Sequence, residues 1–193
     1  MREAQKIGKN GQKKAAARLP EMSPAPDPLP IVSSAHLAAG ESPALSEVEY
    51  GLILAGHGFS RWMTRCMGAA GWPGFSPLEI LILHTTKHRD RPKRLADICL
   101  VLDIEDTHLA TYAIRKLESA GLVSTGRQGK EKIVSPTDKG VDACLRYAAI
   151  RERLLVRTVR ASGSREQAMS ELAASLRSLS GYYDQAARAA ATV

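Results

Sequence analysis

Five polar side chains are predicted to lie on the outer side of a helix at about residues 106–120. The apolar stripe of this helix consists of Ala110, Ile114 and Leu117. The residues that then face outward are Thr107, His108, Thr111, Tyr112 and Arg115. Arginine can hold guanine or a phosphate with two hydrogen bonds, and threonine offers a hydroxyl and a methyl group to base edges. The set predicts contact with nucleic acid, and the alternative is an ordinary solvated helix face.

A second cationic group follows this helix. Two short extended segments, residues 122–125 and 132–135, flank a glycine-bearing turn and predict a β-hairpin. The basic residues of this hairpin are Arg127, Lys130 and Lys132. Such a cluster suits the DNA backbone or the minor groove, whereas its plainer interpretation is a solvated charged turn.

The link before the helix pair is also basic. Residues 87–94 hold five cationic side chains and end at Arg94. This link could clamp backbone phosphates, and an equally good interpretation is a solvated connection.

Residues that could hold a metal or act as thiol sensors are few. His84 and His88 stand four residues apart on a predicted helix, but the spacing fixes no third ligand, so we expect no metal site. Cys66, Cys99 and Cys144 are widely spaced, which favours buried free thiols over redox sensing. The chain lacks a phosphate-binding glycine loop, a nucleophile elbow and paired carboxylates, so we expect neither a cofactor nor catalytic residues, and no enzyme.

Apolar periodicity predicts the elements that position these groups. Ser46, with Glu49 three residues later, predicts the start of a first helix that runs to about residue 67. Ser76, with Pro77 and Glu79, predicts the start of a densely apolar second helix. The further predicted elements are a short helix at 95–102, the helix at 106–120, the hairpin at 122–136, and helices at 137–160 and 165–187.

The N-terminal stretch differs in composition from the rest. Residues 1–18 hold six basic residues against one acidic residue, and five prolines lie within residues 19–31. We expect residues 1–43 to be a mostly disordered basic, proline-rich tail. Its role stays open between a solvated extension, a phosphate-binding arm and a dimer strap.

Charge and hydropathy narrow the class of protein. The 193 residues carry a net charge of +7, and residues 44–193 alone keep +5, which favours a polyanionic partner. No apolar run reaches the length of roughly 18–20 residues that a membrane span needs. We therefore expect a cytoplasmic protein without a membrane partner.

The predicted order of helices and hairpin, together with four sequence segments, resembles the MarR family of bacterial transcription regulators. The segments that carry the resemblance begin at Phe75, Arg94, Ile114 and Ser135 and read FSPLEILILH, RLADICLVL, IRKLESAGLV and SPTDKG. The predicted hairpin at 122–136 corresponds to the wing of that family. It reads TGRQGKEK from Thr125 and lacks the Asp-x-Arg signature of the family. The resemblance covers roughly residues 45–180.

The resemblance implies a mostly α-helical fold with a small β-hairpin, a winged helix-turn-helix flanked by dimerisation helices. Residues 75–140 would be the DNA-binding unit of a domain at 44–193, and residues 44–70 and 141–190 would form the dimerisation helices. We expect a homodimer whose recognition helix reads double-stranded DNA, with a small-molecule effector of unknown identity as a further implied partner. The alternative function is a winged-helix module for protein-protein interaction without specific DNA binding.

Overall fold

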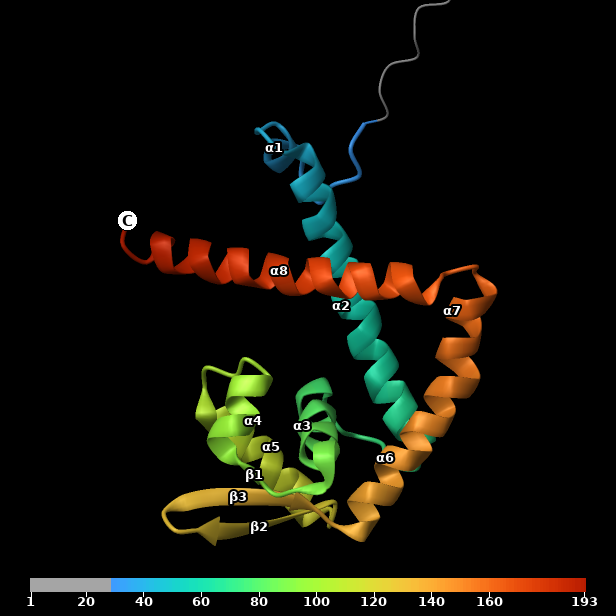
Figure 1. Cartoon of the computed structure of the whole chain (residues 1–193), viewed down its shortest axis with the longest axis vertical. Helices are drawn as coiled ribbons and strands as arrows, with labels where there is room; N and C mark the ends of the chain where they lie inside the picture. Colours follow the sequence, from blue (N-terminus) through green and yellow to red (C-terminus); the bar gives the residue numbers. More distant parts are fainter. Residues whose placement is uncertain (1–28) are drawn as a thin grey trace, which may run out of the picture. The chain divides into compact units, whose positions relative to one another are not determined.

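The computed structural model describes residues 29–193, and the chain divides into two compact units, residues 1–50 and 51–193 (Figure 1). The described part of the first unit holds α1 (Ala35–Ala38) and the first turns of α2 (Pro43–Ala69). The hydroxyl of Ser46 donates to the carbonyl oxygen of Leu37 at 2.8 Å. The prediction that Ser46 begins the first helix is therefore wrong, because α2 starts three residues earlier and Ser46 Oγ bonds back to α1.

The predicted disordered tail corresponds only in part to described residues. Residues 1–28 lie outside the described part of the chain. Within the remainder, α1 forms a short helix, and the backbone N–H of Ile31 donates to Glu47 Oε1 at 2.9 Å. The end of the predicted tail is thus joined to the start of α2 by hydrogen bonds.

The second unit continues from α2 in the predicted order, with small additions. Its elements are α3 (Pro77–Lys87), the 3-10 turn η1 (His88–Asp90), β1 (Lys93–Arg94), α4 (Leu95–Val101), α5 (Thr107–Ser119), β2 (Val123–Gln128), β3 (Glu131–Pro136), α6 (Asp138–Arg151), the π-helical turn η2 (Glu152–Val156), α7 (Arg157–Ala161) and α8 (Glu166–Ala190). The fold class is confirmed: the chain is mostly helical with a small antiparallel sheet. No helix among residues 29–193 is long and apolar enough to cross a membrane.

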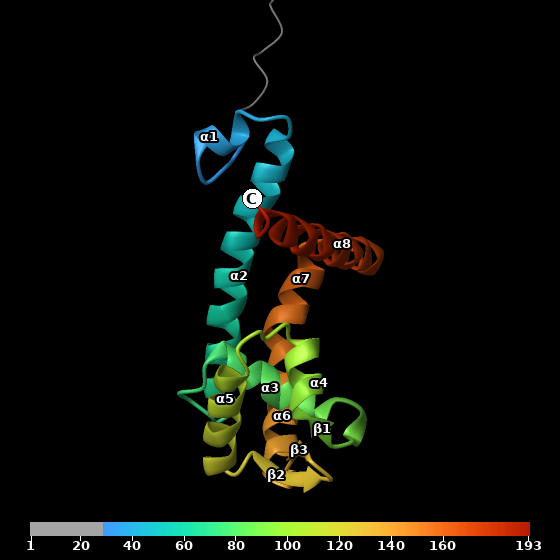
Figure 2. The same cartoon turned by 90° about the vertical axis from the view of Figure 1, so that its left-hand side faces the viewer.

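The three strands form one antiparallel sheet in the order β1-β3-β2 (Figures 1 and 2). The hairpin strands are longer than the predicted segments, so its turn contains only Gly129 and Lys130. Gly129 has φ of +62°, which glycine adopts without the steric cost that a Cβ brings. The sequence did not predict β1, because two residues are too few to show an alternating pattern.

Helix α3 lies at the centre of the core. Ser76 Oγ accepts from the Glu79 backbone N–H, and Glu79 Oε2 accepts from the Ser76 backbone N–H, which is the predicted capping box. Ile80, Ile82 and Leu83 are fully buried. Helix α3 contacts α5, α6 and β3, so its apolar side chains join the helices to the sheet.

The C-terminal helices differ from the single helix predicted at 137–160. Thr137 caps α6 as expected, since its side chain accepts from the Gly140 backbone N–H at 3.1 Å. The helix then passes through η2 before α7 begins. Helix α8 has 25 residues and none of them is buried.

An ion pair between the buried Glu79 and the half-buried Lys116 joins α3 to α5. Lys116 Nζ donates to Glu79 Oε2 at 2.9 Å and to the carbonyl oxygen of Gly74 at 2.7 Å. The same ammonium lies 5.3 Å from the centre of the Phe75 ring. Glu79 is only 5 % exposed, so removing its cation would leave a buried carboxylate without its counter-charge.

The start of α6 passes very close to the end of α5. Gly140 is buried, and a Cβ built on it would overlap the carbonyl oxygen of Leu122. That oxygen also accepts from the Thr137 backbone N–H at 3.1 Å, so it cannot move away freely. Only glycine fits at this crossing.

We therefore expect Gly140→Ala to lower the free energy of unfolding by about 1–3 kcal/mol, the usual cost of overpacking. Urea denaturation monitored by circular dichroism measures the change. The control is Gly51→Ala in α2, where a Cβ meets nothing within 4 Å. Equal stability of the two variants would contradict the close approach.

The ion pair gives a second prediction. Lys116→Met keeps the length of the side chain but removes its charge. It should lower the free energy of unfolding by about 1–2 kcal/mol, because the Glu79 carboxylate stays buried without its counter-charge. In the double variant Glu79→Gln/Lys116→Met the loss should be smaller than the two single losses added together. Additive losses in urea denaturation would show that the two groups are not coupled.

Candidate nucleic-acid interface

Helix α5 presents one buried side and one solvent-facing side. Asp106 caps it by accepting from the His108 backbone N–H at 2.8 Å. Ala110, Ile114 and Leu117, the predicted stripe, are all fully buried. The remaining side is therefore available to a partner.

The structure places four of the five predicted α5 residues in solvent. Thr107, His108, Tyr112 and Arg115 are exposed, and Thr111 is half-buried. Leu109 shares this outer side at 55 % exposure. Leu109 is not among the predicted contact residues, although its spacing of three from Tyr112 places it on the same side of the helix. The outer side of α5 thus combines hydroxyls, one guanidinium, one imidazole and one exposed apolar side chain.

Helices α4 and α5 form a helix-turn-helix. The turn between them contains Asp103 at φ of +52°, a conformation that aspartate tolerates better than most residues. The Ile104 backbone N–H donates to the carbonyl oxygen of Cys99 at 2.9 Å, which closes the end of α4. The turn sets the direction in which α5 leaves α4.

Hydrogen bonds join α5 to the β2–β3 hairpin. Glu118 Oε1 accepts from Thr125 Oγ1 at 2.7 Å and from the Thr125 backbone N–H at 3.2 Å. Thr137 Oγ1 donates to the carbonyl oxygen of Gly121 at 2.6 Å. These contacts tie β2 and the start of α6 to the end of α5. The pair Glu118 and Thr125 carries no recognisable signal in the sequence, because two polar residues at this spacing are common on solvated surfaces.

The wing holds its three predicted cations in different positions. Lys130 lies in the turn and is exposed, while Arg127 and Lys132 are directly opposite each other on β2 and β3. Arg127 is exposed and Lys132 is half-buried. Two like charges directly opposite on one face repel each other, so this end of the hairpin concentrates positive charge.

Arg94 differs from the other predicted residues. It comes from β1, and its guanidinium is held by Asp97 through Nε at 2.9 Å and Nη2 at 2.7 Å. The hydrogen bond lowers the pKa of Asp97 and raises the pKa of Arg94. Two of its donors are thus already used, which leaves fewer for a phosphate.

The histidines and cysteines do not form a metal centre in the part of the chain that is described. Residues 29–193 contain no group of three His, Cys, Asp or Glu side chains arranged around a common point. The three cysteines are free and buried, as predicted. Burial raises the pKa of Cys144 to about 11, despite the nearby charge of Lys87, and it also raises the pKa of Cys66. These two thiols stay protonated at neutral pH.

Comparison with known proteins places this geometry among DNA-binding folds. Residues 75–140 match a family model described as a winged helix DNA-binding domain. None of the curated proteins compared with the chain matches it.

Solved structures match a larger part of the chain. A MarR-family transcriptional regulator from Rhodococcus sp. RHA1 is similar at 14% identity and a TM-score of 0.56, over 72% of this chain and 96% of that chain. The regulator BldR from Sulfolobus solfataricus is similar at 20% identity and a TM-score of 0.58, over 73% of this chain and 98% of that chain. A MarR mutant from E. coli complexed with operator DNA is similar at 12% identity and a TM-score of 0.59, over 72% of this chain and 98% of that chain.

These proteins are described as transcriptional regulators or as MarR, and their sequence identities of 12–20% mean that the likeness concerns the fold. The resemblance predicted from the sequence is confirmed at that level. Residues 75–140 match the winged helix DNA-binding domain model, and the chain as a whole has a fold similar to that of MarR-family transcriptional regulators.

Proposed function

We propose that the chain is a homodimeric transcription regulator that binds double-stranded DNA in a sequence-specific way. Helix α5 enters the major groove, and the wing contacts the backbone or the minor groove. The observation that carries the proposal is the outer side of α5, where hydrogen-bonding side chains lie opposite a fully buried apolar side.

The roles of the α5 residues follow from their chemistry and exposure. Arg115 is exposed and has the donor geometry that matches guanine O6 and N7. Thr111 and Tyr112 offer hydroxyls, and Thr107 and His108 lie in the first turn, near the expected path of the phosphate backbone. The related MarR structure with operator DNA supports double-stranded DNA as the partner.

The wing supplies charge and little sequence information. Arg127 and Lys132 repel each other across the hairpin, and a phosphate between or beside them would relieve that repulsion. Lys130 in the turn extends the positive charge to the tip. Arg94 stays a predicted contact, weakened by its pairing with Asp97.

The dimer follows from apolar surface that this chain leaves uncovered. In α8, Met169, Leu172, Leu176 and Tyr183 recur at helical spacing and are 37–51 % exposed. A helix of 25 residues that buries none of them gains little from packing, and packing is what stabilises most helices. Helix α2 has similarly exposed apolar side chains, Ile53, Leu54 and Phe59. A second copy of the chain would cover both stripes.

The first test concerns recognition. Arg115→Ala should remove most of the preference for a selected operator over random DNA, a loss of about 1–3 kcal/mol per specific contact. Lys130→Ala should weaken binding to all DNA sequences alike. It should also reduce the slope of log affinity against log salt concentration by about one unit. Fluorescence anisotropy at several salt concentrations measures both effects.

The control for both variants is Arg153→Ala, an exposed arginine in η2 outside the winged domain. Unchanged preference in Arg115→Ala would remove α5 from the recognition surface. Absence of any salt-sensitive DNA binding in the unmodified protein would favour the protein-protein interaction module instead.

The second test concerns the dimer. Leu172→Glu places a charge in the α8 stripe and should shift the protein from dimer to monomer in sedimentation equilibrium, because an unpaired buried carboxylate is costly. Leu29→Glu, outside the predicted dimerisation helices and 89 % exposed, is the control. A monomeric unmodified protein, or a dimeric Leu172→Glu variant, would contradict the proposal.

A further inference from the structure

Leu109 gives the outer side of α5 an apolar side chain that hydrogen bonding to DNA does not explain. It is the third residue of α5, and its side chain is exposed. Its backbone N–H donates to the carbonyl oxygen of Asp106 at 3.1 Å, so the residue lies in the capped first turn of the helix. A leucine side chain neither donates nor accepts hydrogen bonds. Its contact with a partner must therefore be apolar.

Helical spacing places Leu109 at the border of the outer side. Successive residues of an α-helix are rotated by about 100°, so Leu109 lies about 60° from Tyr112 around the helix axis. Ala110, the next residue, is fully buried, whereas Tyr112 is 69 % exposed. Thr111 lies about 160° from Leu109, on the opposite border of the outer side. Leu109 and Tyr112 are therefore neighbours on one border, and Thr111 faces a different part of any partner.

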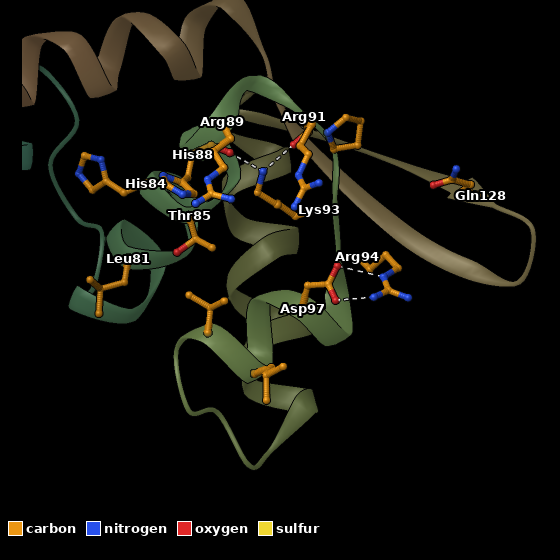
Figure 3. Close-up of a pocket in the computed structure, with 13 residues that line it drawn as sticks. Leu81, His84, Thr85, His88, Arg89, Arg91, Lys93, Arg94, Asp97 and Gln128 are labelled. Atoms are coloured by element: carbon orange, nitrogen blue, oxygen red, sulfur yellow. Dashed lines mark hydrogen bonds and ion pairs between the residues drawn. The ribbon is translucent and has the colours of Figure 1, made fainter. Parts of the chain in front are cut away.

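The other exposed apolar side chains of the winged domain lie elsewhere. Among the described residues of 75–140, the exposed large hydrophobic side chains are Leu100, Val101, Leu109 and Tyr112. Leu100 and Val101 belong to α4 and line the cavity that Figure 3 shows, together with the ion pair of Arg94 and Asp97. Neither of the two residues on α5 lines that cavity. Leu109 is thus the exposed aliphatic side chain on the outer side of α5.

Thymine is the base whose edge fits this side chain. In the major groove, adenine, guanine and cytosine are recognised by hydrogen-bonding groups, whereas thymine also presents its C5-methyl group. The residues that reach base edges lie near the start of a recognition helix. Contact between leucine and the methyl group removes apolar surface of both from water and needs no hydrogen-bond partner. Leu109 has the required chemistry and the required place in α5.

We propose that Leu109 is a specificity-determining residue that contacts the C5-methyl group of one thymine in each half-site of the operator. This inference rests on the proposed function, because it requires α5 to lie in the major groove of a specific site. It adds a determinant that the polar side chains of α5 do not supply. Arg115 and Tyr112 offer hydrogen bonds, and Leu109 adds a preference for thymine at one base pair.

The experiment compares thymine with uracil, which differs from it only by the missing methyl group. Deoxyuridine replaces deoxythymidine in an operator selected from genomic DNA, at one position at a time and symmetrically in both half-sites. Fluorescence anisotropy with the full-length protein measures the affinity for each operator. We expect a position at which binding weakens about fourfold for each methyl group removed, and so about fifteenfold for the symmetric pair.

Variants assign that methyl group to a side chain. Leu109→Ala should bind the thymine and uracil operators equally at this position, because the partner of the methyl group is gone. Alanine favours a helix more than leucine does, so α5 stays formed. Thr111→Ser removes the other methyl group on the outer side of α5 and keeps the hydroxyl, and it should still show the loss at this position.

The matched control is Leu100→Ala, the same truncation at an 81 % exposed leucine of α4. It should keep both the affinity of the unmodified protein and the loss on uracil substitution. An equal effect of Leu100→Ala and Leu109→Ala would contradict a specific role for Leu109.

The outcomes separate this inference from the proposed function. If the unmodified protein prefers no DNA sequence, both fail. Specific operator binding that no uracil substitution weakens would overturn the role of Leu109 alone. A Leu109→Ala variant that keeps the full loss, or a Thr111→Ser variant that abolishes it, would also overturn that role and leave the DNA-binding function standing.

Discussion

Burial of α3 is the constraint from which the geometry of the winged domain follows. Ile80, Ile82 and Leu83 are fully removed from water, and each contributes about 1.5–3 kcal/mol as an upper estimate. The first turn of the same helix contains Glu79, whose buried carboxylate needs the ammonium of Lys116. Helix α5 can therefore occupy one position only, with its apolar stripe against α3 and Lys116 next to the capping box. The direction of the outer side of α5 is a consequence of that packing.

The wing depends on the same arrangement through a short chain of contacts. Glu118 near the end of α5 holds Thr125 of β2, and Gly140 allows α6 to cross directly beneath Leu122. The cations of the hairpin are thus placed by α5, the helix whose outer side carries the exposed polar side chains. In the proposed complex the two contact regions would move as one body, so that recognition by α5 and backbone contact by the wing reinforce each other.

Local signals in the sequence were sufficient for most of the fold. The capping box at Ser76, the stripe of α5 and the hairpin all depend on neighbouring residues, and the structure contains each of them. Features that depend on distant residues were not predicted. The Lys116–Glu79 pair joins residues 37 positions apart, and β1 exists only because it pairs with β3. Ser46 shows the converse error, since a good capping residue was used for a tertiary hydrogen bond to Leu37 instead.

The central claim is that two copies of α5 read one DNA site. Selecting bound fragments from the genomic DNA of the source organism and sequencing them tests this claim most directly. The account predicts an enriched inverted repeat whose half-sites are separated by about one helical turn, roughly 10–10.5 base pairs, because a twofold dimer presents its recognition helices at that spacing. Recovered fragments without a shared motif, or with a single unrepeated half-site, would contradict it.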